Sequence, residues 1–218
     1  MLKTFPKGGI HLPENKLSAA NPIEVLPLPS MVIIPLSQHI GAPPVVKIKT
    51  GDRVKTGQLI AESAAFVSAN IHSSASGTVK KTGDFLAASG YSCQAAQIAV
   101  EGDVWEDGID TSDDLITEIA ANAEEIVKKV TAAGIVGLGG ATFPVHVKLI
   151  VPSGKKAEML VVNGVECEPY LTCDHRLMLE KGPEIIVGTR ILMKALNVNK
   201  AVVGIENNKP DAIAHLQK

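Results

Sequence analysis

The chain has 218 residues, enough for one large domain or two small ones. Hydrophobic residues make up 45% and charged residues 20%, so we expect a packed core and exclude a globally disordered chain. The formal net charge of −2, with both signs spread along the chain, argues against a nucleic-acid-binding surface, and no apolar run approaches the roughly 18 residues of a membrane span.

Residues 1–30 are rich in Pro, Lys and Asn and show no sustained periodicity. Two interpretations fit this composition, an extended segment that wraps around the rest of the protein and a partly disordered leader. The first residues lack the long apolar stretch of a secretory signal.

Residues 31–108 consist of short β runs separated by turn residues, which predicts a compact all-β module. The expected strands are residues 31–35, 44–48, 58–61, 77–80 and 96–100, with turns at residues 50–52 and 56–57. Residues 46–61 and 74–79 resemble the two halves of biotinyl and lipoyl domains, which are barrel-sandwich hybrids. Those domains carry their cofactor on a lysine between the halves. Residues 64–70 contain no lysine, so we expect the module to be structural, and a carrier function is disfavoured.

Residues 109–218 change to an α/β pattern. Apolar residues at steps of three and four predict a helix over residues 115–130, with Thr111 and Asp114 as its cap and Gly134 as its end. A strand over 159–163, a helix over 183–197 and a strand over 201–205 form a βαβ unit with a parallel sheet. A further helical pattern begins at Pro210 and is interrupted at Lys218, so we expect the natural protein to continue.

A glycine-rich loop at residues 137–144, followed by Lys148, is the sharpest chemical signal. Glycines allow a close backbone approach to a ligand, and main-chain N–H groups ahead of a helix suit a phosphate. The loop matches neither GxxxxGK[ST] nor GxGxxG. An ordinary turn between helix and strand is an equally good interpretation of the spacing alone.

Polar residues follow both predicted strands of the βαβ unit. Asn163, Glu166 and Glu168 follow the first strand, and residues 206–209 follow the second. The carboxyl ends of parallel strands are good ligand positions, and amides and carboxylates suit the hydroxyl groups of a ribose or ribityl chain. Solvated loop charges and a helix cap at Asn207 or Asn208 are the plain alternatives.

The cysteines Cys93, Cys167 and Cys173 form no CxxC, so we expect no metal site in this chain. Cys167, Cys173 and His175 do not have a standard ligand spacing. The odd number of cysteines does not suggest a disulfide framework.

Taken together, the motifs resemble the C subunit of the Rnf ferredoxin:NAD oxidoreductase complex over essentially the whole chain. The segments that carry the resemblance are residues 7–11 with 13–16, 137–144 with Lys148, 163–170 with 174–176, and 204–210. The second half also resembles the flavin-bearing subunit of respiratory complex I, which holds FMN against a GxGGxGFP loop. Thr142 replaces a glycine of that loop, and Val165 stands where complex I has an acidic residue.

The resemblance implies a set of FMN-contacting residues and a stacking surface for the nicotinamide or adenine at Phe143. The implied set is Gly137, Gly139, Gly140, Ala141, Thr142, Phe143, Lys148, Asn163, Glu166, Glu168, Glu206 and Asn207. It assigns no catalytic acid or base. It also implies a domain order of an extended segment (1–30), a barrel-sandwich hybrid (31–108) and the first part of a Rossmann-like flavin domain (109–218).

The implied function is electron transfer between NAD(H) and iron–sulfur carriers through FMN, in a membrane-associated ion-translocating complex. The 4Fe–4S clusters are expected only in the part beyond Lys218. Other Rnf subunits and a nicotinamide nucleotide are the expected partners, at the cytoplasmic side of the membrane. The alternative is a non-catalytic docking fragment of the same complex without bound flavin.

Overall fold

The computed structural model describes residues 12–87 and 90–217, so the motif at residues 7–11 lies outside the described residues. The chain forms two compact units. The β unit contains Leu26–Lys156 and Lys194–Asn197, and the α/β unit contains the described residues of Met1–Val25, Ala157–Met193 and Val198–Lys218. The predicted domain boundaries at residues 30 and 108 stay predictions. No helix within the described residues is long and apolar enough to cross a membrane.

The β unit is built on two antiparallel sheets, which confirms the predicted barrel-sandwich hybrid. One sheet has the order β1-β7-β6-β3 and the other β2-β4-β5. The strands are β1 (Met31–Pro35), β2 (Val45–Val46), β3 (Arg53–Val54), β4 (Leu59–Glu62), β5 (Ile71–His72), β6 (Gly77–Leu86) and β7 (Ser92–Val100). Two of these strands, β3 and β5, were not predicted, and β6 and β7 are longer than expected.

Aliphatic side chains fill the space inside this β unit. The buried cluster contains Ile34, Leu36, Ile48, Val54, Ile60, Ala61, Ile71, Val79, Ala96 and Ile98. Turns are placed where glycines adopt positive φ, as predicted for Gly51 (94°) and Gly57 (82°). Burial alternates only at the start of β6, where Gly77 and Val79 are buried, and the register of β6 against β7 shifts between Val79 and Lys81.

The first helix of the chain is shorter than predicted. Helix α1 (Ala123–Ala132) begins at a capping box, in which the Asn122 side chain accepts from the Glu125 amide and the Glu125 side chain accepts from the Asn122 amide. Residues 111–121 are not helical, and the Asp110 carboxylate instead accepts from the Ser112 amide. The predicted start of this helix, with Thr111 and Asp114 as its cap, was therefore wrong, because the local cap at Asn122 defines the start. Gly134 ends the helix with φ 65°, as expected.

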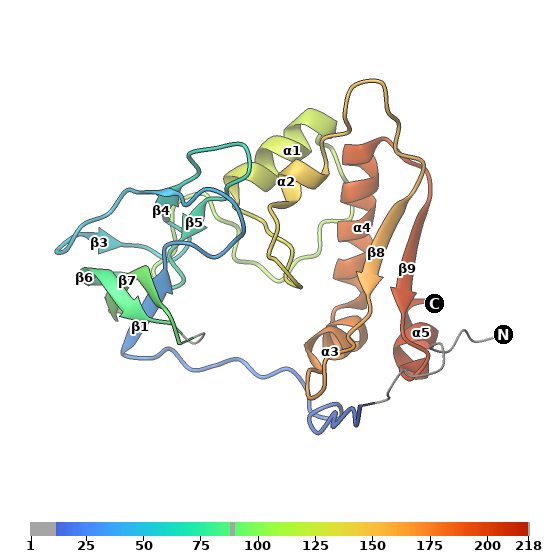
Figure 1. Ribbon diagram of the computed structural model, residues 1–218, viewed down its shortest axis with the longest axis horizontal. Coiled ribbons are helices and arrows are strands. Elements are labelled where there is room, and N and C mark those ends of the chain that lie inside the picture. The colour runs from blue at the N-terminus through green and yellow to red at the C-terminus, as the bar shows by residue number, and fades with distance from the viewer. Residues whose placement is uncertain (1–11, 88–89, 218) are drawn as a thin grey trace. The chain divides into compact units, whose positions relative to one another are not determined.

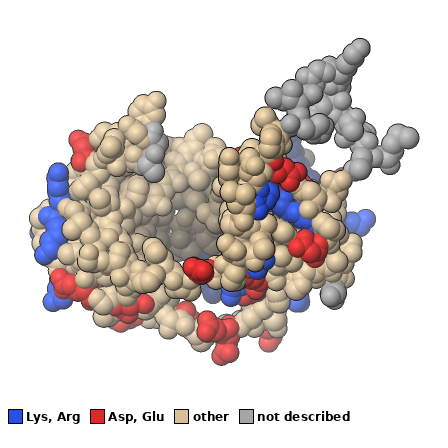
Figure 2. Space-filling model, turned by 90° about the horizontal axis from the view of Figure 1, so that it is seen from below, with Lys and Arg blue, Asp and Glu red and all other residues tan. Residues whose placement is uncertain are grey.

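The α/β unit contains the parallel pair β8 (Leu160–Gly164) and β9 (Ala201–Ile205), which Figure 1 shows as neighbouring arrows pointing the same way. Helix α4 (Gly182–Leu196) connects them, which confirms the βαβ unit. Helix α3 (Cys173–Glu180) was not predicted, and α5 (Pro210–Leu216) follows β9 as expected. Figure 2 shows positive and negative side chains interspersed on the face that it draws, in keeping with the small net charge.

Candidate functional site

The glycine-rich loop lies in the β unit, directly after α1. Its base is closed by a bridge between Val136 and Pro144 and by the Gly137 amide, which donates to the Phe143 carbonyl at 2.9 Å. Beyond this base the chain turns through Gly140 (φ 59°) and Thr142 (φ 48°). A β-branched residue is rarely found in this left-handed region, where the resembling loops have glycine. The backbone therefore keeps a glycine-like turn although the residue is Thr142.

The tip of the loop is exposed and carries main-chain N–H groups without protein acceptors among the described residues. Within residues 12–87 and 90–217, the amides of Leu138, Gly139, Gly140 and Ala141 donate to no protein acceptor. Leu138 is 90% exposed, and nothing lies within 4 Å of a Cβ placed on Gly139 or Gly140. Unpaired, accessible amides on a surface without side chains are the features that an anion requires.

A lysine adds positive charge at the base of the same loop. Lys148 is the last residue of the short helix α2 (Val145–Lys148), for which Pro144 is the N-cap. Its Nζ would lie 3.0 Å from a Cβ placed on Gly137, so ammonium and loop backbone are adjacent. Lys148 therefore lies beside the loop within the β unit, and its predicted contact with the flavin stays a prediction.

The hairpin segment 64–70, where carrier domains have their lysine, is packed against the flanks of this loop. Ser68 and Ala69 are buried, and the His146 Nε2 contacts the Phe66 carbonyl at 3.0 Å. The Asn70 side chain donates to the Ala132 carbonyl at the end of α1. The second half of this segment is thus buried and hydrogen-bonded in the β unit, whereas residues 64–66 at its start are exposed.

The second group of predicted residues lies in the α/β unit, beyond the carboxyl ends of β8 and β9. Asn163 pairs with Gly204 in the sheet, and its Oδ1 accepts from the Val165 amide at 3.1 Å. Asn163, Glu168 and Asn207 are exposed. The Glu206 carboxylate forms an ion pair with Lys209 at 2.6 Å. The sheet register thus brings residues 163–168 and 206–207 to one edge, as predicted.

Glu166 differs from its neighbours because it is only 2% exposed. One carboxylate oxygen, Oε1, accepts from the Asp174 amide at 2.8 Å in the first turn of α3 and lies 3.5 Å from the Cys173 Sγ. The other, Oε2, lies 3.9 Å from the Lys16 Nζ and has no hydrogen-bond partner among the described residues. Glu166 thus caps a helix that was not predicted from the sequence, and its predicted flavin contact stays a prediction.

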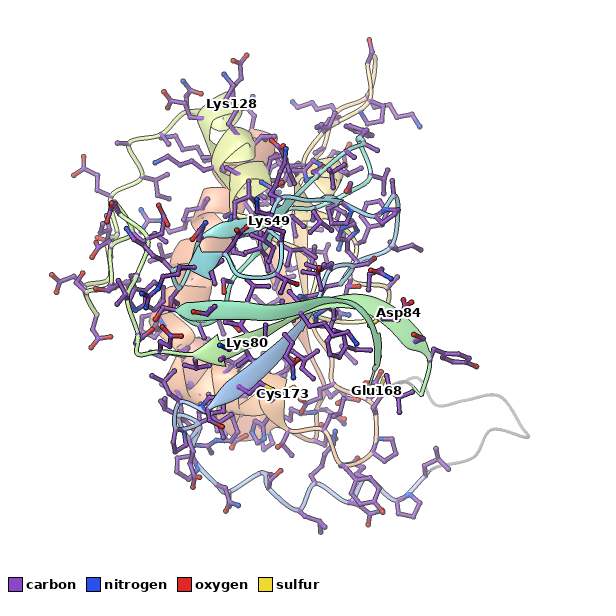
Figure 3. The ribbon with its side chains drawn as sticks, turned by 90° about the vertical axis from the view of Figure 1, so that its left-hand side faces the viewer. Lys49, Lys80, Asp84, Lys128, Glu168 and Cys173 are labelled. Atoms are coloured by element: carbon purple, nitrogen blue, oxygen red, sulfur yellow. The ribbon has the colours of Figure 1, made fainter. Side chains whose placement is uncertain are left out.

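The buried carboxylate changes the titration of its neighbours. Burial, followed by the charges of Glu166 and Glu168, raises the pKa of Asp174 despite the opposing effect of Lys209 and Lys16. Burial and a hydrogen bond to Glu166 likewise raise the pKa of the Cys173 thiol. Figure 3 labels Glu168 and Cys173, which lie just before and at the start of α3.

Oxygen and sulfur atoms of Glu166, Cys173 and Asp174 lie within 4.8 Å of one another, a spacing that a metal ion could bridge. The Lys16 ammonium already supplies positive charge beside this cluster. We therefore assign no metal ion to it. All three cysteines are free thiols in the described residues.

The comparisons with known proteins match both halves of the chain. Residues 3–104 match the family described as the RnfC barrel sandwich hybrid domain, and residues 130–218 match the Nuo51 FMN-binding domain. The second match begins before the glycine-rich loop and includes every predicted flavin-contacting residue.

Full-length relatives are similar along nearly the whole chain. The C subunit of a proton-translocating ferredoxin:NAD(+) oxidoreductase complex from Clostridium ljungdahlii is 51% identical over 100% of this chain and 47% of its own length. A Na(+)-translocating counterpart from Acetobacterium woodii is 45% identical over 97% of this chain and 48% of its own. The C subunit of an ion-translocating oxidoreductase complex from Rhodobacter capsulatus is 46% identical over 95% of this chain and 40% of its own.

This chain spans about half the length of the curated relatives it matches. The resemblance to the Rnf protein, inferred from a handful of short motifs, is confirmed by the identity along the whole chain and by the two domain matches. The chain thus joins a segment that matches the RnfC barrel sandwich hybrid domain to a segment that matches the Nuo51 FMN-binding domain, and it is similar over nearly its whole length to about half the length of the C subunits of ion-translocating ferredoxin:NAD(+) oxidoreductase complexes.

Proposed function

We propose that this chain is the FMN-binding part of a protein that transfers electrons between NAD(H) and iron–sulfur carriers. The single observation that carries the proposal is the run of exposed residues from Leu138 to Ala141, whose amides have no protein acceptor among the described residues. The family match to an FMN-binding domain supports it, as do the names of the relatives.

The residues of the loop fit the phosphate of FMN. The open surfaces of Gly139 and Gly140 allow an anion to reach the backbone, and Lys148 lies at the base of the loop. A dianionic phosphate gains charge-assisted hydrogen bonds from such a set, each stronger than a neutral one. Phe143, which is half-buried, is proposed as the stacking surface for the nucleotide.

The polar residues of the α/β unit are proposed to bind hydroxyl and ring groups of the flavin. Exposed Asn163, Glu168 and Asn207 offer amide and carboxylate groups for ribityl hydroxyls. Glu206 is held by Lys209, so its carboxylate is already oriented. Glu166 is included through its Oε2, which has no hydrogen-bond partner among the described residues, although this oxygen is buried and lies 3.9 Å from the Lys16 ammonium.

When bound, FMN supplies the conversion between two-electron hydride transfer and one-electron steps. The chain's own residues bind and orient it, and none is assigned a proton-transfer role. The 4Fe–4S clusters, the NAD(H) partner, ion translocation and the peripheral location at the cytoplasmic side of the membrane are proposed for the whole protein, by analogy with the named relatives.

Titration of the chain with FMN, followed by quenching of flavin fluorescence, tests the proposal. Gly139→Asp and Lys148→Glu each place a negative charge near the phosphate, and we expect at least about a tenfold rise in Kd, because a charged hydrogen bond contributes about 1.5–3 kcal/mol. Gly154→Asp and Lys128→Glu are the matched controls, at an open glycine and an exposed lysine outside the loop.

Unchanged FMN affinity in both loop variants would contradict the assignment. In the full-length protein, the same two substitutions are expected to abolish anaerobic NADH oxidation, while the controls retain it. Persistent activity in both variants would show that the glycine-rich loop does not hold the flavin.

A further inference from the structure

Lys16 lies in a segment that resembles the family but that the proposed function leaves without a role. Its ammonium donates to three main-chain carbonyl oxygens, those of Glu166 (2.8 Å), Glu168 (2.9 Å) and Leu171 (2.7 Å). An ammonium has three N–H donors and no acceptor, so these carbonyls satisfy it completely. The Lys16 side chain is only 15% exposed.

The positive charge of Lys16 is balanced by the carboxylate of Glu166, a residue of the same segment. Glu166 Oε2 lies 3.9 Å from the ammonium and has no hydrogen-bond partner among the described residues, so Lys16 is the cation that stabilises this buried carboxylate. Removing one member of a buried ion pair leaves the other uncompensated. The main-chain carbonyls of Glu166–Leu171 therefore form a cation-binding position, and the Lys16 ammonium occupies it.

Residues close to Lys16 in the chain form hydrogen bonds to the same segment. The Glu14 carbonyl accepts from the Tyr170 amide at 2.8 Å, and the Glu14 carboxylate accepts from the Asn208 side chain at 2.9 Å. Ser18 and Thr172 share a hydrogen bond between their hydroxyl groups at 2.7 Å. Residues 14–18 thus bridge the segments that follow β8 and β9, and we call them the strap.

The backbone conformation of the Glu166–Leu171 segment, which the strap contacts, is not the one that its own residues prefer. Tyr170 has φ 70°, a left-handed conformation that costs a bulky residue free energy and that persists only when the surroundings impose it. Its amide is bound by the strap, and the Leu171 carbonyl beside it is bound by Lys16. The bends around Pro169 and Tyr170 are therefore imposed from 150 or more residues away in the chain.

We propose that Lys16 is a positioning residue that acts as a tethered cation and holds the Glu166–Leu171 segment in the conformation that presents Glu168 to the flavin. The inference rests on the proposed function for its consequence at the flavin, but the ordering of the segment does not depend on it. Glu168 is exposed and two of the bound carbonyls belong to Glu166 and Glu168 themselves. Loss of the ammonium therefore releases the backbone that carries this carboxylate.

The test is Lys16→Ala in the chain, measured in two ways. Hydrogen exchange without flavin reports whether the amides of residues 166–174 lose protection, and fluorescence titration reports the Kd for FMN. We expect faster exchange confined to these residues and about a tenfold or greater rise in Kd. Lys200→Ala, at an exposed lysine of the same unit, is the matched control and should change neither.

Added propylammonium chloride makes the experiment specific, because it restores the atoms that Lys16→Ala removes. It should restore both protection and FMN affinity, whereas tetramethylammonium chloride at the same concentration has no N–H donor and should restore neither. A merely structural lysine would lower thermal stability without this rescue. If Lys16→Ala does not fold, Lys16→Met preserves the side-chain volume without the charge and is measured in its place.

Each outcome separates the two proposals. Unchanged exchange of residues 166–174 overturns the role of Lys16, whether or not FMN binds. Faster exchange with unchanged FMN affinity also overturns it, because the segment would then not position a flavin contact. Failure of the unsubstituted chain to bind FMN overturns the proposed function instead, and the exchange and amine-rescue measurements alone then decide whether Lys16 orders the segment.

Discussion

The two units of this protein both bury aliphatic side chains but differ in the carboxylate and ammonium groups that they bury. The β unit encloses a cluster of aliphatic residues, among which Ile60 and Ile98 are fully buried. The α/β unit buries charged groups, Glu166 (2% exposed) and Lys209 (3%), and leaves Val161 62% exposed on its short sheet. Apolar burial is non-directional and insensitive to pH, whereas buried charges require specific partners. We therefore expect the β unit to be the stable support and the α/β unit to depend on its hydrogen-bond network.

The largest effect is expected in the core of the β unit. Ile98→Ala should lower the free energy of unfolding by about 2–5 kcal/mol, because it leaves a cavity among tightly packed neighbours. Urea denaturation and hydrogen exchange along β6 and β7 measure it. Ile33→Ala is the control, since this side chain on the paired strand β1 is 50% exposed and should cost far less. Equal costs would mean that the cluster is not the source of stability.

A substitution in the buried Lys16–Glu166 pair tests whether the α/β unit depends on buried charges. Glu166→Gln keeps the shape of the side chain but removes the charge opposite Lys16, and we expect a loss of about 1–3 kcal/mol. Hydrogen exchange in the first turn of α3 should rise, while the β unit keeps its protection. Glu168→Gln, at an exposed carboxylate, should leave exchange unchanged. A uniform loss of protection in both units would argue against separate sources of stability.

A glycine of the β unit tests the packing of its hairpin against α1. Gly134 (φ 65°) is so close to the hairpin that an added Cβ would lie 2.1 Å from the Asn70 carbonyl oxygen. Gly134→Ala should therefore cost about 1–3 kcal/mol, through both strain and overlap. Gly154 (φ 77°) has no neighbour within 4 Å, so Gly154→Ala isolates the strain. Equal shifts in Tm for both variants would exclude a steric role for Asn70.

The smallest expected effect is on the rate at which the Cys173 thiol of the α/β unit is alkylated. Burial and the hydrogen bond to Glu166 raise the pKa of Cys173 above the ordinary thiol value of 9.0. The reactive thiolate therefore forms at higher pH in the folded protein than in the unfolded one. At pH 8, native Cys173 should react with iodoacetamide several-fold more slowly than denatured Cys173, and the difference should shrink as pH rises through the folded pKa. Cys167, which is exposed like Cys173 but whose Sγ contacts the Glu168 carboxylate instead of the buried Glu166, serves as the internal control in mass spectrometry.

The sequence predicted best where local signals were strong. The strand 201–205 was placed at its observed bounds, and α4 was placed within one residue at each end, because each has a clear apolar period. The start of α1 was placed too early, since residues such as Leu115 and Ile119 continue the helical period although the cap at Asn122 excludes them from the helix. Helix α3 was missed because its first turn is stabilised by Glu166, a partner outside the helix.

By itself, the sequence determined the two kinds of architecture, the glycine-rich loop and the two strand ends that carry polar residues. These follow from periodicity and from glycine, which act over a few neighbouring residues. The tertiary structure decided that Glu166 is buried, that Thr142 adopts a glycine-like turn and that Lys16 binds three carbonyls. Those properties depend on contacts between residues far apart in the chain, which no local pattern records.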